Sequence, residues 1–441
     1  MNFKPVRQLA VSRTLADGQS VPVGTLAQNR QGAFFQYNAE YLSVHGNLSP
    51  FTLNASVELQ PAPRQPHQGL HGLFADSLPD GWGFLLQDRV FRRRGILPNQ
   101  VTPMDRLAFV GQRGIGALSF APESDLRSEE DTHIDMARLG LEAQALFDQQ
   151  ISDQAAEGGP SNEILTALIT AGSSGGARPK AQLYCNAHQP DQYRTRPMDG
   201  DEAWLVKFTS SNLPLGHEEG LCEAVYLSLA EQAGLQPPER KLLEAPSQSG
   251  AEAWLSLKRF DWINQGNAVP AGRMHMHSAC GLLDADFRMP SLDYVDLIKA
   301  SRQLCRSPAV GQLQFRRAVF NLLAANQDDH SKNWAFLQND AGLWQPAPFY
   351  DVTFSPHPFN EHATAFGGYG NKPPLKVMQK MAATAGFGQW RQAQQCIQEI
   401  QDVLNGFMHA AHSTGVSETT AKAIQKTLDQ RYLENKHLFV K

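Results

Sequence analysis

The chain has 441 residues, of which 41% are hydrophobic and 19% charged, with a formal net charge of −5 at pH 7. This length exceeds one ordinary hydrophobic core, so we expect a globular protein of two or three domains. The acidic balance argues against a basic surface that runs over the whole chain.

The cysteines and the hydrophobic stretches restrict the class of protein further. The five cysteines stand singly, and no Cys-x-x-Cys pair is present. A zinc ribbon or a redox dithiol is therefore not expected, and the pattern fits reduced thiols in a cytoplasm. The N-terminus has no apolar signal core, and no stretch reaches the ~18 continuous apolar residues of a membrane span. We expect a cytoplasmic protein with no membrane partner.

The chain is predicted to have three parts, and a change of composition after about residue 121 marks the end of the first. Residues 1–122 are predicted as a β-rich N-terminal subdomain, with short strands at 21–26 and 32–37 separated by polar turns that contain glycine. Polar and acidic residues follow, and we place the boundary of the subdomain there. The next two parts are predicted over residues 123–260 and 261–441.

One helix of the N-terminal part carries clear end signals. It is predicted from Phe84 to Arg94, with Asp80 as a candidate cap and Gly95 as its stop. Its last residues, Arg92–Arg94, suit the negative end of the helix dipole. We expect them to form a solvated helix end, with a local basic patch as the alternative.

A run rich in glycine and serine, residues 172–180, lies between a helix-like and a strand-like stretch. Its glycines allow backbone N–H groups to approach an anion closely, and two basic side chains add positive charge. The spacing differs from that of a Walker motif, so an ordinary P-loop nucleotidase is disfavoured. A flexible linker is the alternative. The candidate cofactor-binding residues here are Gly175, Gly176, Ala177, Arg178 and Lys180.

The following strands and helix suggest the small lobe of a kinase. Lys207 lies in an apolar strand, where its charge needs a partner such as a phosphate or an acid; an edge-strand lysine facing solvent is the alternative. Glu223, on the next predicted helix, is our choice of acidic partner, although it could instead be solvated. The strand that contains Lys258 and Phe260 leaves the lobe where a kinase hinge would hold adenine.

A polar cluster, Asn326–Asn333, joins an apolar helical run to a strand-like run. Asp328 and Asn333 have the Asp-x4-Asn spacing of a kinase catalytic loop, in which the acid receives a hydroxyl proton and the amide holds magnesium. Asp351 follows as the second acid that such a site needs. The spacing alone is weak, because many solvated turns contain it by chance.

The remaining C-terminal part is mostly helical in pattern, with helices predicted over 292–303, 311–325, 389–411 and 419–432. His275 and His277 stand two positions apart and could share a metal ion on one side of a strand. Two ligands are too few for a closed site. We therefore predict that they are ordinary loop or surface histidines.

Several motifs in one order resemble the HipA family of serine/threonine kinases, and the resemblance covers nearly the whole chain. They are Val23-Gly-Thr-Leu, Phe35-Gln-Tyr, Leu78-Pro-Asp80, Arg113-Gly-Ile-Gly-Ala-Leu118, Gly175-Gly-Ala-Arg-Pro-Lys180, the strand with Lys207, Lys258-Arg-Phe260-Asp261, Asp328-Asp-His-Ser-Lys-Asn333 and Phe349-Tyr-Asp351.

This resemblance implies an α+β, two-lobed protein-kinase-like fold with a small β-rich N-terminal subdomain and a mostly helical C-terminal lobe. It implies ATP and Mg²⁺ as cofactors, and transfer of phosphate to a serine or threonine of a protein. It also implies a growth-inhibiting toxin with a HipB-like, DNA-binding antitoxin as partner. In some members the target is an aminoacyl-tRNA synthetase.

The family pattern assigns a role to each matching residue. Asp328 is the catalytic residue, and Asn333 and Asp351 are the metal ligands. Lys207 holds phosphate, and Lys258 and Phe260 offer backbone groups to adenine. Ser173, or its neighbour Ser174, is the autophosphorylated residue of the loop. The cofactor-binding set also takes in His330 and Lys332, which lie inside the catalytic motif.

Two positions depart from the pattern of well-known members. Arg178 replaces a glutamine, so the contacts of the loop and its self-inhibition are less firmly implied. Asp329 replaces a glycine of some members and is expected to add charge at the metal site. Two other classes of function stay open: a small-molecule kinase of the aminoglycoside type, and a scaffold without catalysis that only binds an antitoxin.

Overall fold

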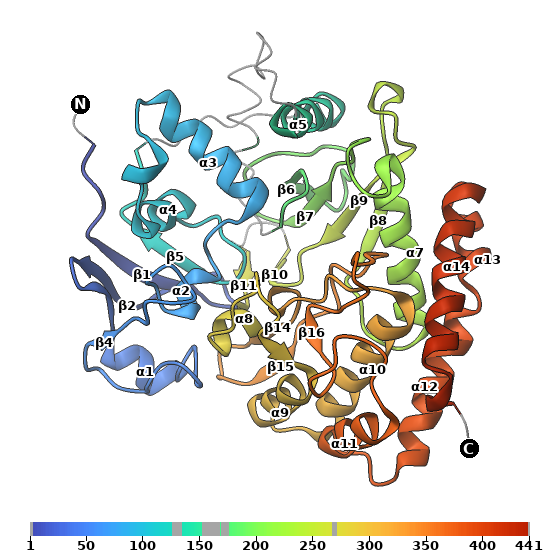
Figure 1. Cartoon of the computed structure of the whole chain (residues 1–441). Helices are drawn as coiled ribbons and strands as arrows, with labels where there is room; N and C mark the ends of the chain where they lie inside the picture. Colours follow the sequence, from blue (N-terminus) through green and yellow to red (C-terminus); the bar gives the residue numbers. More distant parts are fainter. Residues whose placement is uncertain (1–2, 126–134, 152–167, 169–175, 267–270, 440–441) are drawn as a thin grey trace.

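The computed structural model describes residues 3–125, 135–151, 168, 176–266 and 271–439 (Figure 1). Its first part is a five-stranded antiparallel sheet, in the order β4-β3-β2-β1-β5. Alternate residues of β1, such as Leu9 and Val11, are buried because successive side chains of a strand point to opposite faces. The strands are β1 (Gln8–Thr14), β2 (Ser20–Asn29), β3 (Gly32–Tyr37), β4 (Gln60–Pro61) and β5 (Leu118–Ala121).

Four helices complete this region: α1 (Ala39–His45), α2 (Gly72–Ala75), α3 (Gly81–Arg93) and α4 (Pro103–Val110). Helix α3 begins three residues before the predicted Phe84, and it ends near Gly95, whose φ is 73°. Arg92–Arg94 are exposed at its end, as expected for a solvated terminus. Asp80 occupies the N-cap position, but its side chain makes no cap hydrogen bond. Its role therefore lies elsewhere.

The second sheet is antiparallel and has four strands in the order β6-β7-β9-β8. These are β6 (Lys180–Asn186), β7 (Asp201–Lys207), β8 (Arg240–Glu244) and β9 (Ala253–Lys258). Residues of α3 and of α5 (Met136–Ile151) share a core with this sheet, around Trp82, Leu183 and Trp254. Helix α7 (Glu219–Gln232) is buried along most of its length and joins the core of the large lobe.

The large lobe is built mainly from helices: α8 (Ala279–Leu282), α9 (Tyr294–Cys305), α10 (Pro308–Ala324), α11 (Leu375–Ala385), α12 (Trp390–Leu404), α13 (Phe407–Thr414) and α14 (Glu418–Glu434). Helix α10 lies at the centre, with Phe315, Val319 and Phe320 fully buried. Its apolar residues lie in the core of the lobe, while Arg316 is only partly buried. The predicted helix 389–411 is divided in two at Asn405 and Gly406, and glycine favours a helix poorly.

Short strands complete the lobe: β12 (His275–Ser278), β14 (Ala335–Gln338) and β15 (Trp344–Pro346) in one antiparallel sheet, and the pairs β10 (Trp262–Ile263) with β11 (Gly272–Arg273) and β13 (Leu292–Asp293) with β16 (Thr364–Ala365). Figure 1 shows α12 to α14 at the edge opposite the N-terminal sheet. The predicted two-lobed α+β architecture is confirmed. Among the described helices, none has both the length and the apolar composition to cross a bilayer.

The prediction for the two histidines was wrong. His275 and His277 lie on β12 and are buried. His277 Nδ1 lies 2.6 Å from Asp76 Oδ2, and its Nε2 lies 2.8 Å from Ser49 Oγ. His275 Nε2 lies 3.2 Å from the Leu48 carbonyl oxygen. These contacts join the large lobe to the N-terminal region, which a sequence pattern within residues 275–277 does not reveal.

Candidate active site

The polar cluster lies in the connection between α10 and β14, as the sequence predicts. Helix α10 ends at Ala324, and the φ of 54° at the next residue, Ala325, turns the chain out of the helix. Asn326 is buried, and its Nδ2 donates to Asn321 Oδ1 at 2.8 Å. Ser355 Oγ donates to Asn326 Oδ1 at 2.9 Å. The loop is therefore held from both sides before it reaches Asp328.

Asp328 and Asn333 lie together in this loop. The Asn333 side-chain amide donates to the Asp328 carbonyl oxygen at 2.8 Å, which leaves the amide oxygen of Asn333 for a ligand. The Asp328 side chain is 67% exposed, and His330 Nε2 lies 3.8 Å from Asp328 Oδ1. Partial desolvation, followed by repulsion from Asp351, raises the pKa of Asp328. An exposed carboxylate with a raised pKa suits proton transfer.

Asp329 does not join this site, and the expectation that it adds charge there was wrong. Its side chain is buried and turned into the lobe. Tyr294 and the backbone N–H of Thr364 donate to it, and His362 Nδ1 lies 2.8 Å from its Oδ2. Asp329, next to the candidate catalytic acid, is therefore a structural residue that anchors the loop to the large lobe.

Lys207 joins the small lobe to the large lobe. Its Nζ lies 2.7 Å from Glu223 Oε1 and 2.6 Å from Asp351 Oδ1. The predicted pairing with Glu223 on α7 is confirmed. Burial opposes the charge of Lys207, but Asp351 and Glu223 outweigh this and raise its pKa. In turn, burial opposes ionisation of Asp351, and the charges of Lys207 and Lys180 outweigh it, so its pKa is held far below the usual range.

The described part of the Gly-rich loop, residues 176–180, lies near the same acids. Arg178 Nη1 pairs with Glu219 Oε2 at 2.9 Å. Lys180 is buried, and burial together with the positive charge of Lys207 lowers its pKa. Gly176 has a φ of 95°, a backbone conformation that residues with a Cβ rarely adopt, so glycine is favoured there. Ala177 is exposed. Ser173, Ser174 and Gly175 lie outside the described residues.

At the predicted hinge, Lys258 and Phe260, some hydrogen-bonding groups already contact other parts of the protein. The Lys258 N–H donates to the Glu239 carbonyl oxygen at 2.8 Å, so it is not available to an adenine. The Lys258 ammonium pairs with Glu202 at 2.6 Å and with Glu239 at 3.1 Å. Phe260 is half-buried, with its ring centroid 5.6 Å from that of Tyr350. Adenine binding at Lys258 and Phe260 stays a prediction.

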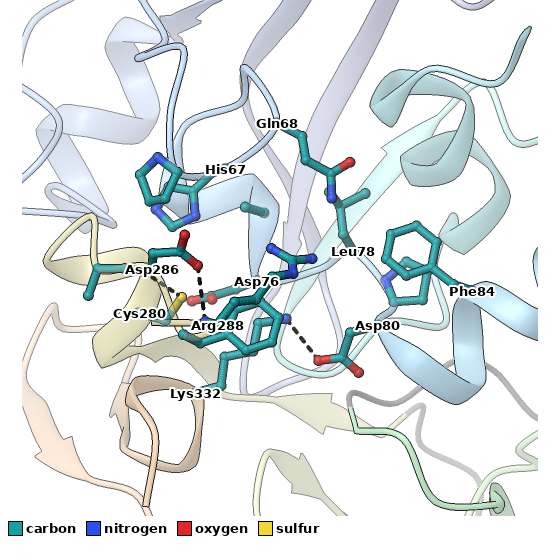
Figure 2. Close-up of a pocket in the computed structure, with 15 residues that line it drawn as sticks. His67, Gln68, Asp76, Leu78, Asp80, Phe84, Cys280, Asp286, Arg288 and Lys332 are labelled. Atoms are coloured by element: carbon teal, nitrogen blue, oxygen red, sulfur yellow. Dashed lines mark hydrogen bonds and ion pairs between the residues drawn. The ribbon is translucent and has the colours of Figure 1, made fainter. Parts of the chain in front are cut away.

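Asp80 belongs to this region, although the sequence suggested only a helix cap. Figure 2 shows its carboxylate opposite the ammonium of Lys332, and the distance between Oδ2 and Nζ is 2.9 Å. Lys332, predicted to bind cofactor, is thus already paired. The two side chains line a cavity of about 30 Å³. Such a volume holds a water molecule or two but no nucleotide.

Asp351 and Asn333 fit a magnesium ion that would also bind phosphate oxygens. Mg²⁺ takes hard oxygen ligands and is commonly held by one or two protein groups together with substrate phosphates. Asp351 and the amide oxygen of Asn333 are such groups. Within the described ranges, no cluster of three or more His, Cys, Asp or Glu side chains could hold a metal by itself. The set therefore suits a metal that arrives with a nucleotide.

The fold and the site together define a class. Lys207, at the end of a strand in a small antiparallel sheet, pairs with Glu223 of helix α7, and a mostly helical lobe carries the Asp-x4-Asn loop and Asp351. This is the arrangement of a two-lobed, protein-kinase-like fold. Residues 172–409 match the HipA-like C-terminal domain, and residues 17–121 match the HipA N-terminal domain. The chain belongs to the HipA family.

Two known proteins illustrate the relationship. Y4mE of Sinorhizobium fredii (strain NBRC 101917 / NGR234), which its name describes as a candidate kinase, is 26% identical over 352 residues, covering 75% of this chain and 74% of that protein. The structure of the Shewanella oneidensis MR-1 toxin–antitoxin complex of HipA, HipB and operator DNA contains a chain that aligns with a TM-score of 0.65 at 16% identity. That alignment covers 97% of both chains and supports the fold.

Proposed function

We propose that this chain is an ATP- and Mg²⁺-dependent serine/threonine protein kinase of the HipA type. The observation that carries the proposal is the meeting of Lys207 and Asp351, with Nζ 2.6 Å from Oδ1. The cationic Lys207 of the small lobe and the acidic Asp351 of the large lobe are thus in direct contact. Phosphoryl transfer depends mainly on positioning and on neutralising the phosphate charge, and less on covalent catalysis, so a contact between the lobes suits it.

The residues divide the reaction between them. Magnesium would neutralise phosphate charge when bound, and Asn333 and Asp351 are the groups that would hold it. Lys207, Arg178 and the backbone N–H groups of the Gly-rich loop hold the phosphates, apart from the Gly176 N–H, which donates to Asp80. Asp328 orients the acceptor hydroxyl and receives its proton while the γ-phosphoryl group moves to the hydroxyl oxygen and ADP leaves.

We propose the acceptor and the biological role from the resemblance to the family. The acceptor is a serine or threonine of a cellular protein, for which an aminoacyl-tRNA synthetase is the first candidate, and Ser173 or Ser174 of the chain itself. The role is that of a growth-inhibiting toxin in the cytoplasm, with a HipB-like antitoxin as partner and DNA bound through it. The Shewanella complex of HipA, HipB and operator DNA supports this partner.

The test is incubation of the purified protein with radiolabelled ATP, Mg²⁺ and a cell lysate. We expect label on one or a few lysate proteins and on the chain, lost with EDTA and with Asp328→Ala. Consumption of ATP with a panel of metabolites but with no labelled protein would instead identify a small-molecule kinase. Binding of an antitoxin without any ATP turnover would identify a scaffold.

A further inference from the structure

Asp80 is a buried carboxylate that connects three parts of the molecule. It belongs to the N-terminal region, immediately before α3. Its Oδ2 pairs with Lys332 Nζ of the catalytic loop at 2.9 Å (Figure 2). Its Oδ1 accepts a hydrogen bond from the Gly176 N–H of the Gly-rich loop. One side chain thus joins the two loops that the proposed reaction requires.

The backbone beside Asp80 supports the same segment of the Gly-rich loop. The Trp82 N–H donates to the Gly176 carbonyl oxygen at 3.1 Å, and Trp82 Nε1 donates to the Lys180 carbonyl oxygen at 2.8 Å. A Cβ at Gly81 would lie 2.5 Å from the Cα of Ala177, so the two backbones are in close contact. The backbone and side chain beside Asp80 therefore also contact the Gly-rich loop.

Lys332 is equally well placed on the catalytic side. It precedes the candidate metal ligand Asn333, and its carbonyl oxygen accepts a hydrogen bond of 2.6 Å from the hydroxyl of Tyr350, which precedes Asp351. Its ammonium also lies 4.3 Å from the centroid of the Phe287 ring. A shift of Lys332 would therefore be transmitted to both candidate metal ligands.

Stabilisation of α3 does not explain the carboxylate. An aspartate at an N-cap normally accepts hydrogen bonds from the first N–H groups of its helix. Asp80 makes none of these and instead contacts Gly176 and Lys332. Charge-assisted hydrogen bonds of this kind are the strong and directional ones. The side chain is therefore committed to the two loops.

We propose that Asp80 is a positioning residue that fixes the Gly-rich loop relative to the catalytic loop. This rests on the proposed kinase function. Asp80 acts through Gly176 and Lys332, not by contact with the nucleotide. Without it, Gly176 and the loop residues that follow it lose their fixed position relative to the catalytic loop. We expect ATP binding to weaken more than the chemical step.

The experiment compares Asp80→Ala, Asp80→Asn and the control Asp88→Ala. Asparagine keeps an oxygen that can accept from Gly176 but loses the charge that pairs with Lys332. Asp88 lies on α3 in the same N-terminal region. It pairs with Arg106 at 2.6 Å and, among the described residues, with neither loop. Each variant is measured for KM and kcat with ATP, for the Kd of ATP by calorimetry, and for the melting temperature.

We expect Asp80→Ala to raise the KM and Kd for ATP at least tenfold, with less than a threefold change in kcat. Asp80→Asn should recover part of this affinity, and Asp88→Ala should match the wild type. Adding Lys332→Met to Asp80→Ala should cost less than the two single changes together, because the partners are coupled. Amide hydrogen exchange of the peptide that contains Gly176 should rise in Asp80→Ala.

The results separate this proposal from the proposed function. Wild-type protein that binds ATP but transfers no phosphate overturns the kinase function, while the Kd series still decides the role of Asp80. Active wild type with an unchanged Kd and unchanged exchange at Gly176 in a folded Asp80→Ala overturns the positioning role. If Asp80→Ala does not fold, Asp80→Asn with wild-type Kd and exchange overturns the role equally.

Discussion

Lys207 and Asp351 are separated by 144 positions in the chain, and their charged atoms lie 2.6 Å apart. The lysine comes from the end of β7 and the aspartate from the segment that follows β15. Asp351 holds its place with a φ of 57°, a backbone conformation that a residue with a Cβ seldom adopts. Such strain persists where the surroundings impose it, and it occurs often at functional sites.

The first prediction concerns the partner of Lys207 on α7. Glu223→Ala leaves a buried ammonium with one acid instead of two, since the side chains of Lys207 and Glu223 are 8% and 2% exposed. We expect a loss of unfolding free energy of about 3 kcal/mol. Misplacement of Lys207 should lower kcat/KM by about 100-fold. Urea titration and initial-rate assays measure these quantities.

The matched control lies on the same helix. Glu231 pairs with Arg240 at 2.8 Å, but its side chain is 67% exposed. Glu231→Ala should therefore cost less than about 1 kcal/mol and leave the rate unchanged. Equal losses of stability for the two variants would show that Lys207 gains nothing particular from Glu223.

Two neighbouring aspartates give the second prediction. Asp328→Ala removes an exposed side chain, so stability should change by no more than about 0.5 kcal/mol, while transfer falls by about a thousandfold. Asp329→Ala breaks a buried network with Tyr294, His362 and Thr364, so we expect a loss of about 3 kcal/mol. Thermal unfolding and label transfer distinguish them. A fully active Asp328→Ala removes that residue from the mechanism.

The sequence predicted those parts of the site that follow from regular elements. Lys207 and Glu223 were paired correctly, because a strand and a helix have fixed periods and an apolar strand leaves a lysine in need of an acid. Asp328 and Asn333 were placed correctly between a helix and a strand, because the apolar runs on either side were clear.

The remaining parts depended on irregular backbone or on distant partners. Asp329 stands next to Asp328, but in an irregular loop the direction of each side chain has no period to reveal it. The sequence suggested Asp80 as a helix cap, whereas its partners Gly176 and Lys332 lie 96 and 252 positions away. His277 is buried and contacts Asp76 and Ser49 of the N-terminal region. Packing between parts of the chain decided these positions.

The third prediction concerns self-phosphorylation. Ser173 and Ser174 belong to the loop whose described end begins at Gly176, where the backbone N–H donates to Asp80. Incubation with ATP and Mg²⁺ should add phosphate to one of them, and intact-mass and peptide mass spectrometry would locate it. The double change Ser173→Ala with Ser174→Ala should abolish the added mass, and so should Asp328→Ala. An unchanged mass of the wild-type chain after long incubation contradicts the prediction.

The fourth prediction is a pH dependence set by Asp328. Its carboxylate acts in the deprotonated form, so kcat/KM should fall as the pH drops through its pKa. Desolvation and Asp351 raise that pKa, and the acid limb should therefore lie above the ordinary aspartate value of about 3.9.

The charge of His330 works in the opposite direction and lowers the pKa of Asp328. His330→Gln should thus move the acid limb to higher pH, while His188→Gln, on an exposed turn after β6, should leave it in place. A pH–rate profile of the three proteins measures the limb, and a shift to lower pH in His330→Gln would show that another group sets it.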